Sequence, residues 1–346
     1  MTEVACPLPL GRYDRIVMGH GGGGRLGADL LKEIFLPAFG NEVLSALEDQ
    51  ATVRAGGARL AFTTDSFVVR PLFFPGGDIG RLAVNGTVND LAVGGARPLF
   101  IAAAFILEEG LEIDVLRRVA ASMGAACKEA GVSIVTGDTK VVDRGKGDGI
   151  FITTSGIGVV PEGIHLSAGR AKPGDRVVLS GSLGDHGMAV MSVREGLEFE
   201  TALLSDTAPL NGLAEAMLAA CPSIRCMRDP TRGGLASSLN EIAAASQVAV
   251  RIRENAIPVR REVAGACELL GFDPLYVANE GKLVAIVPPE DADRLVEAMR
   301  AHPMGRDACV IGETVDKPSG HVIMTTGTGG QRIVSVLTSE QLPRIC

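Results

Sequence analysis

The chain has 346 residues, of which 46% are hydrophobic but only 4% aromatic, and it contains no Trp. This length is more typical of two domains than of one, and the composition indicates a core of closely packed Ala, Val, Leu and Ile. The net charge of −8 and the pI of about 5.3 argue against a nucleic-acid binder, whose affinity comes from Lys and Arg that neutralise phosphates. A phosphate ligand would therefore need a metal ion.

The sequence also indicates a compartment. No apolar run approaches the roughly 20 residues that a membrane-spanning helix needs, and the N-terminus lacks a charged and apolar signal sequence. The seven cysteines are scattered along the chain and do not resemble a disulfide framework. We therefore expect a cytoplasmic protein that binds neither membranes nor nucleic acid.

The first glycine-rich stretch is HGGGGR, at residues 20–25. Four consecutive glycines are costly to order, so this loop is either a mobile linker or a backbone cradle that closes on phosphate. It is not a Walker A loop, because no Gly-Lys-Ser/Thr follows. Apolar residues at helical spacing begin at Leu26, so the loop feeds a helix whose N-terminal amides could assist anion binding.

Two strands are expected after residue 48, joined by a turn at residues 55–57. Asp49 lies before the first strand, and Asp65 lies where the second leaves the core. Ligand groups usually lie at such strand ends, and the two carboxylates could share one cation site.

A helix is expected from its N-cap, Asp78, to Gly94. On it Asn85 and Asn89 lie four residues apart, and Asp90 adjoins them, so the polar groups share a face. Such a face is costly to bury unless it meets a ligand or a satisfied hydrogen-bond network. The alternative is a solvated helix face, but the small residues along the helix favour close approach of backbone or ligand.

A further strand is expected to end in Asp138, Thr139 and Lys140. A lysine next to a carboxylate is either a surface ion pair of little energetic weight or, if desolvated, a proton-transfer group. The sequence leaves both interpretations open.

A Gly- and Pro-rich stretch at residues 161–174 marks the domain boundary. The second half repeats one design of the first, because Asp229 precedes a helix entered through two glycines. His186, at the start of another helix, is interpreted as a capping or surface residue. Glu280 lies in the turn Asn279–Gly281 between two expected strands, which either exposes a carboxylate at a sheet edge or is a plain hairpin turn.

The chain ends in Pro-Arg-Ile-Cys. Chain ends are usually mobile, so a packing role for Cys346 is not expected. The cysteine is either an accidental terminus or a thiol that travels. Arg344 would favour its thiolate form, while the neighbouring terminal carboxylate opposes it.

Several segments together resemble a known family. They are Asp49 with Ala51–Val53, the stretch from TTDSF to GGARP (63–98), TGDTK (136–140), RDPTRGGLA (228–236), ANEGKL (278–283) and the terminal PRIC. Over nearly the whole chain they resemble HypE, the carbamoyl dehydratase family of [NiFe]-hydrogenase maturation. The chain is more distantly similar to the superfamily of aminoimidazole ribonucleotide synthetase and selenophosphate synthetase. The latter place a reactive Cys or selenocysteine before the glycine loop, where this chain has Met18 and Gly19.

The resemblance implies an α/β (α+β) fold of two domains like aminoimidazole ribonucleotide synthetase, with mixed sheets flanked by helices and a flexible C-terminal tail. We predict an ATP-binding and dimerisation domain at residues 1–165 and a second α/β domain at residues 166–330. Residues 331–346 are predicted to form a mobile tail that carries the terminal cysteine.

The resemblance further implies ATP and Mg²⁺ as cofactors. Hard cations take oxygen ligands and bridge to phosphate. The implied metal ligands are Asp49, Asp65, Asp90 and Asp229. The residues assigned to the nucleotide are Asp65, Asn85, Asn89 and Asp138, with His20, Gly21, Gly22 and Gly23 of the glycine loop.

The implied reaction is the ATP-dependent dehydration of a carbamoyl group on Cys346 to a thiocyanate. Glu280 would take a proton, and Lys140 would tune or relay it. The implied partners are a carbamoyltransferase that loads Cys346, an iron-carrying scaffold complex that accepts cyanide for the hydrogenase iron, and a second copy of the chain in a homodimer. Two alternatives stay open: a superfamily enzyme that acts on a free small-molecule amide or selenide with ATP, and a non-catalytic assembly scaffold.

Overall fold

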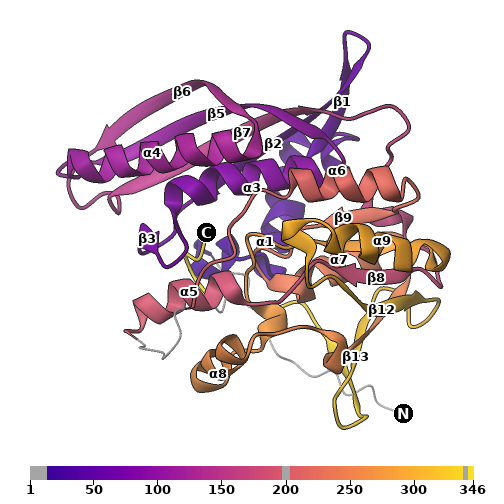
Figure 1. Cartoon of the computed structure of the whole chain (residues 1–346). Coiled ribbons are helices and arrows are strands. Elements are labelled where there is room, and N and C mark those ends of the chain that lie inside the picture. Colours follow the sequence, from indigo (N-terminus) through magenta and orange to yellow (C-terminus); the bar gives the residue numbers. More distant parts are fainter. Residues whose placement is uncertain (1–13, 197–202, 338–341) are drawn as a thin grey trace.

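The computed structural model describes residues 14–196, 203–337 and 342–346. Each half of the chain builds one large sheet with its own helices, and Figure 1 shows the two halves as an upper and a lower layer. The C-terminus lies in the middle of the molecule, near β3 (Phe73–Phe74) and α5 (Asp185–Arg194). The end of the chain is therefore placed between the two domains.

The first sheet has five strands in the order β1-β2-β7-β5-β6. All neighbours are antiparallel except β5 and β6, which run parallel. The strands are β1 Ala51–Ala55, β2 Ala58–Phe67, β5 Arg97–Glu108, β6 Ser133–Val142 and β7 Ile150–Val159. Gly56 and Gly57, both with positive φ, form the turn between β1 and β2, so the predicted pair of strands is confirmed.

Helix α3 (Ile79–Val93) begins at the predicted cap. Asp78 Oδ1 accepts hydrogen bonds from the backbone N of Gly80 at 2.8 Å and of Arg81 at 3.1 Å. The helix is buried on almost every side, because it lies between the first sheet and the second domain (Figure 1). Helix α4 (Ile113–Ala130) packs beside it and covers the outer part of the sheet.

The second sheet has seven strands in the order β14-β13-β10-β12-β8-β11-β9. The strands are β8 Arg176–Leu179, β9 Cys226–Arg228, β10 Ala249–Arg253, β11 Val284–Val287, β12 Cys309–Val315, β13 Val322–Thr325 and β14 Gln331–Val334. The helices of this half are α5, α6 Asn211–Ala220, α7 Gly234–Ser246, α8 Arg261–Leu270 and α9 Ala292–Arg300. Because β14 pairs with β13, the sheet extends past residue 330, the end that the sequence predicts for this domain.

Two expected element boundaries were wrong. Strand β6 does not end in Asp138, Thr139 and Lys140 but continues to Val142, because it pairs with β5 along its whole length. Glu280 does not lie in a hairpin turn between two strands. A short 3-10 helix, Pro274–Tyr276, precedes it, and β11 follows it.

The glycine loop leads into a short helical hook, formed by α1 Arg25–Leu30, a π-helical turn Leu31–Phe35 and α2 Leu36–Phe39. This agrees with the helical spacing that begins at Leu26. Within the described ranges, no helix combines the length and the apolar character that crossing a membrane requires.

Candidate active site

Five acidic side chains from both domains lie close enough to alter one another's ionisation. Asp49 precedes β1, Asp65 lies on β2 and Asp90 on α3, while Asp229 follows β9 and Glu280 precedes β11. Each of them interacts with at least one other member, by charge or, for Asp65, by a side-chain hydrogen bond with Asp90. The structure therefore brings together the four predicted metal ligands and the predicted catalytic glutamate, which we call the acid cluster.

Burial is the main cause that raises the pKa of each carboxyl group in this cluster. Asp90 and Asp229 are raised well above their ordinary pKa, because neighbouring carboxylates add to the effect of burial. The pKa of Glu280 is also raised well above its ordinary value, first by burial and then by Asp229, Asp206 and Asp65. Repulsion between buried like charges favours protonated acids, and a cation placed among them would relieve it.

The acids of the first domain are connected by one threonine. Thr63 Oγ1 lies 2.7 Å from Asp90 Oδ2 and 3.0 Å from the carbonyl oxygen of Asp49. A side-chain hydrogen bond between Asp90 and Asp65 lowers the pKa of Asp65, which fits a protonated Asp90 as the donor. Oriented oxygen atoms of this kind suit a hard cation.

The acid cluster is not a closed metal cage. Among the described residues, no three His, Cys, Asp or Glu side chains converge tightly enough to hold an ion by themselves. Mg²⁺ keeps several waters and is usually bound through one or two carboxylates together with substrate phosphates. The donor set therefore fits a magnesium ion that is shared with a phosphate ligand.

Two arginines of the second domain belong to this site, and the sequence analysis missed both. Arg228, only 5% exposed, pairs with the carboxylate of Asp49 and donates from Nη2 to the carbonyl oxygen of Leu47 at 2.9 Å. The charge of Arg232 lowers the pKa of Asp65 and Glu280, although burial outweighs it. The motif RDPTRGG contained the signal, because basic residues flank Asp229 on both sides.

The glycine loop packs against the start of α7. Ser237 Oγ donates to the carbonyl oxygen of Gly23 at 3.1 Å, and Arg232 Nη1 donates to that of Gly21 at 2.5 Å. A Cβ atom on Gly23 would lie 2.5 Å from the Arg232 carbonyl oxygen, so this close approach requires glycine. Beside the loop is a cavity of about 780 Å³ whose lining includes Gly23, Asp49 and Arg228. Of the two interpretations of the loop, this position favours the cradle.

His20 and Gly22 lie in the same loop. The ring of His20 is within hydrogen-bond distance of Val17, with Nδ1 3.0 Å from its backbone N. Contact of residues 20–23 with a nucleotide stays a prediction.

The two asparagines of α3 are buried and join the domains. Asn89 Nδ2 donates to the carbonyl oxygens of Ala208 and Glu280 at 3.1 and 3.2 Å, and its Oδ1 accepts from the backbone N of Leu210 at 2.8 Å. Asn85 Nδ2 donates to Thr207 Oγ1 at 3.2 Å. The polar face is thus buried in a hydrogen-bond network rather than solvated, although among the described residues Asn85 Oδ1 has no hydrogen-bond partner. The contact of both amides with a nucleotide stays a prediction.

Glu280 is held through its backbone. Its N donates to Asp206 Oδ1 at 3.1 Å, and Lys282 Nζ lies 2.9 Å from Asp206 Oδ2. Burial would raise the pKa of Asp206, but Lys282 and His186 lower it overall. Two neighbouring acids whose pKa values shift in opposite directions are typical of sites that perform proton transfer.

Lys140 lies away from this arrangement within one chain. It sits on the edge strand β6 opposite Ile106, and its ammonium pairs with Asp138 on the same strand. Both side chains are exposed, at 69% for Lys140 and 64% for Asp138. In a single chain the pair is therefore a surface ion pair, and Lys140 is not brought beside Glu280.

The end of the chain is docked near the acid cluster. Leu342 and Ile345 are buried, and Cys346 packs against the same core cluster, which includes Val277 and Ala278 just before Glu280. The Cys346 carbonyl oxygen accepts a hydrogen bond from the backbone N of Val68 at 3.1 Å, three residues after Asp65. The expectation that the last residues do not pack was wrong for residues 342–346.

His186 takes part in this docking. It is fully buried, its ring meets Phe74 edge-on, and its Nε2 lies 2.8 Å from the carbonyl oxygen of Ile345. Burial lowers its pKa, so the neutral ring donates from Nε2 and accepts at Nδ1 from Ser205 Oγ, 2.8 Å away. The interpretation of His186 as a capping or surface residue was wrong.

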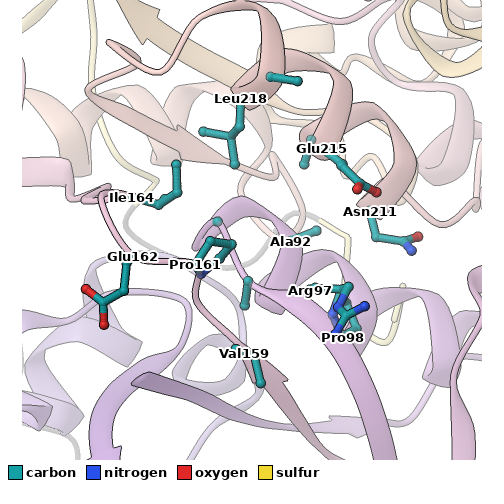
Figure 2. A pocket seen from close by; sticks show the side chains of 14 residues that line it. Ala92, Arg97, Pro98, Val159, Pro161, Glu162, Ile164, Asn211, Glu215 and Leu218 are labelled. Atoms are coloured by element: carbon teal, nitrogen blue, oxygen red, sulfur yellow. The ribbon is translucent and has the colours of Figure 1, made fainter. Parts of the chain in front are cut away.

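A second cavity, of about 480 Å³, lies between the domains at the far end of α3. Figure 2 shows Leu218 and Glu215 of α6 on one side of it, and Pro161, Ala92 and Arg97 on the other. Its walls are mainly apolar, and the lining contains none of the five acids of the acid cluster.

Comparison with known proteins agrees with the two-domain architecture. Residues 47–160 match the N-terminal domain of the AIR synthase related protein family, and residues 172–325 match its C-terminal domain. With its two α/β halves, the chain has the fold of the AIR synthase related protein family.

Full-length relatives are more specific. The chain is 58% identical to "Carbamoyl dehydratase HypE" of Azotobacter vinelandii over 97% of this chain and 98% of that protein. Among solved structures it is similar to a HypE–HypF complex, with a TM-score of 0.85 and 52% identity over 89% of this chain and 99% of that one. It is also similar to hydrogenase maturation protein HypE in complex with ATP, with a TM-score of 0.81 and 49% identity over 96% and 100% of the two chains. The chain belongs to the HypE family of carbamoyl dehydratases.

Proposed function

We propose that this chain uses ATP and Mg²⁺ to dehydrate a carbamoyl group carried on its own C-terminal cysteine, forming a thiocyanate that supplies cyanide for the iron of [NiFe]-hydrogenase. The thiocarbamate S–CO–NH₂ loses its oxygen and two protons and becomes S–C≡N. ATP supplies the phosphoryl group that converts this oxygen into a leaving group, so that ADP and phosphate are the other products. The observation that carries the proposal is the docked end of the chain. The Cys346 carbonyl oxygen accepts from the backbone N of Val68, three residues after Asp65, and Cys346 packs against the core cluster that includes Ala278, two residues before Glu280.

The acid cluster would supply oxygen ligands for magnesium, and the phosphates would be bound through the metal. Burial raises the pKa of Asp49, Asp65, Asp90 and Asp229, most strongly for Asp90 and Asp229, whose neighbouring carboxylates add to the effect, so the free protein favours their protonated forms. A magnesium nucleotide would replace these protons as the source of positive charge. The glycine loop at residues 20–23 and the cavity beside it lie next to Asp49, where phosphates would be sheltered from water.

Glu280 is the group that we assign to proton transfer. Its raised pKa makes it a stronger base than an exposed glutamate, and its backbone is fixed by Asp206 and Asn89. Taking a proton from the carbamoyl nitrogen is the step that allows the activated oxygen to leave. Magnesium brought to the neighbouring aspartates would lower the pKa of Glu280 and release it to act as the base.

Lys140 would contribute through a homodimer. The outer face of the first sheet carries exposed large apolar side chains at Phe62, Phe100, Ile106 and Ile157. Cross-strand pairing places Phe62 and Phe100 next to Ile157, and Lys140 next to Ile106. An apolar sheet face of this kind is typical of an association surface. We propose that two copies pack through it, and that Lys140 and Asp138 act in the site of the second copy.

The proposed partners follow from the chemistry of the tail. A carbamoyltransferase must load Cys346, and the solved HypE–HypF complex of a relative supports an association of this type. An iron-carrying scaffold complex would then accept the cyanide. The tail must reach both partners, so the docked position would alternate with an undocked one.

The test starts from protein carbamoylated at Cys346 and incubated with Mg-ATP. Intact-mass measurement of the C-terminal peptide should show the loss of one water from the carbamoylated form. Deletion of Cys346 should abolish thiocyanate formation while ATP binding is retained. Thiocyanate produced by the deletion variant would refute the assignment and favour an enzyme that acts on a free amide.

A variant of Glu280 separates the enzyme from a scaffold. Glu280→Gln keeps the backbone contacts to Asp206 and Asn89 but removes the base, so single-turnover dehydration should fall by about 100-fold or more. The protein should still bind ATP and its loading enzyme. A non-catalytic scaffold predicts the same ATP consumption in both proteins.

A further inference from the structure

The docked tail is held through its main chain, and each carbonyl oxygen from Pro343 to Cys346 accepts a hydrogen bond. Arg194 donates to Pro343 at 2.6 Å and to Arg344 at 2.7 Å. His186 serves the Ile345 carbonyl, and the backbone N of Val68 serves that of Cys346. The segment is therefore bound mainly through its backbone, by a surface that we call the tail receptor and define as Val68, Arg70, Asp148, His186 and Arg194.

Arg194 occupies a special position in the tail receptor, because it bridges three segments. It is the last residue of α5 in the second domain. Besides the two tail carbonyls, its Nε and Nη2 donate to the carbonyl oxygen of Arg70 in the first domain at 3.2 and 2.5 Å. A planar guanidinium can satisfy several acceptors at once in a fixed geometry, which a lysine cannot do.

The side chain of Arg344 adds a second fastening on the first domain. Its Nε donates to the carbonyl oxygen of Val68 at 3.1 Å, and its guanidinium pairs with Asp148. The backbone of Arg344 has φ of 56°, in the left-handed region that is uncommon for residues other than glycine. Such a conformation persists only when surrounding contacts enforce it.

We propose that Arg194 is the positioning residue that holds the tail in its docked state, by tying the Pro343 and Arg344 carbonyls to the first-domain carbonyl of Arg70. The inference rests on the proposed function of the tail as a substrate arm. Because the donor belongs to α5 of the second domain and the acceptors belong to the first domain and to the tail, the tail docks only when both domains are in register. Docking of Cys346 is thereby coupled to assembly of the acid cluster, whose members also come from both domains.

The contacts also explain how one receptor can serve a tail that changes chemically. Main-chain carbonyls are identical whether Cys346 carries a thiol, a carbamoyl group or a cyanide. Arg194 therefore positions all three forms and leaves discrimination between them to groups nearer the sulfur. Loss of Arg194 should lower the rate of dehydration at saturating ATP by a larger factor than it raises the ATP concentration for half-saturation.

Limited trypsin digestion of the full-length protein tests the proposal directly. Cleavage after Arg344 requires its guanidinium to leave Asp148 and enter the protease, so the rate at which the last two residues are released reports undocking. In Arg194→Ala this rate should rise by about tenfold or more, as expected when charge-assisted hydrogen bonds are lost. Arg194→Lys keeps the positive charge but lacks the planar guanidinium that serves several acceptors at once. It should be cleaved faster than wild type but more slowly than Arg194→Ala.

The control is Arg54→Ala, which removes an exposed arginine on β1 that lies 3.8 Å from Glu162 and has no contact with the tail. It should be cleaved after Arg344 at the wild-type rate. Wild-type cleavage in Arg194→Ala, equal acceleration in Arg54→Ala, or full protection in Arg194→Lys would each overturn the proposal. The digestion needs neither carbamoyl group nor ATP, so failure of the dehydration assay in wild type would refute the proposed function while the role of Arg194 is read separately.

Discussion

Arg228 is the side chain whose loss should damage the site most. It is 5% exposed and connects β9 of the second domain to the segment that precedes β1 in the first. Its guanidinium pairs with Asp49, donates to the Leu47 carbonyl oxygen at 2.9 Å and lies 3.4 Å from Glu48. Arg228→Met keeps the length and the apolar stem of the side chain, so the substitution removes mainly the charge and its hydrogen bonds.

The expected cost follows from what remains behind. The side chains of Asp49 and Glu48 are each only 20% exposed, and Glu241 lies 3.8 Å from the guanidinium, so three acids lose their common cation. Removing one partner of a buried pair costs about 3–5 kcal/mol, because the other charge is left without compensation. We therefore expect the free energy of unfolding to fall by about 3–5 kcal/mol, and the pKa of Asp49 to rise further above its ordinary value.

Urea denaturation followed by circular dichroism measures this cost, with Arg117→Met as the control, since Arg117 is 74% exposed and pairs with Asp114 on the surface of α4. The double variant Arg228→Met/Asp49→Asn should recover part of the loss, giving a coupling of about 1 kcal/mol or more in the mutant cycle. A loss within about 1 kcal/mol of that in the Arg117 control, or strict additivity of the cycle, would refute the reasoning about the buried network.

Three further predictions concern the acids, the domain joint and the sheet face. Burial and its neighbours raise the pKa of Asp229, so the free protein loses stability as pH rises from the ordinary carboxyl range through this raised pKa. At alkaline pH, Asp229→Asn should therefore melt at a higher temperature than wild type, although it should lose dehydration activity. A lower melting temperature at that pH would contradict the reasoning that ionised Asp229 destabilises the free protein. Asn89→Ala removes three buried hydrogen bonds between the domains and should lower the free energy of unfolding in urea by about 2–4 kcal/mol. An unchanged free energy of unfolding would show that Asn89 does not stabilise the contact between the domains. Ile157→Lys places a charge on the outer sheet face and should convert the proposed dimer to monomer in sedimentation velocity; an unchanged sedimentation coefficient would exclude that face.

The local features that the sequence predicted are those decided by neighbouring residues. The turn at Gly56 and Gly57, the Asp78 cap and the boundaries of α3 depend on capping, on positive φ and on apolar spacing within a few positions. The strand-to-helix step at Asp229 was visible for the same reason. The motifs then placed Asp49, Asp65 and Asp90 in one site, which the structure brings together.

The features that the sequence did not predict depend on contacts between distant segments. Strand β6 continues past Asp138 because β5, about 30 residues earlier, supplies its hydrogen bonds, and no pattern within TGDTK records that pairing. His186 is buried because the end of the chain lies on it, 159 positions away in sequence. The sequence shows Arg228 as a basic residue next to Asp229. Its contact with residues 47–49 could not be predicted, because neither segment carries a pattern that identifies the other.

The repulsion in the acid cluster and the docking of the tail support the same order of binding events. Without a cation, burial disfavours ionisation of Asp65, Asp90 and Asp229, and the carboxylates that did ionise would repel one another across the two domains. A magnesium nucleotide would remove this repulsion, and the domains in register would present the Arg70 carbonyl and the guanidinium of Arg194 together as a receptor for the tail. Binding of the nucleotide would then favour the docked Cys346, and release of the products would favour its departure. This order would keep the reactive sulfur away from the site until the phosphoryl donor is in place, which would limit competing hydrolysis.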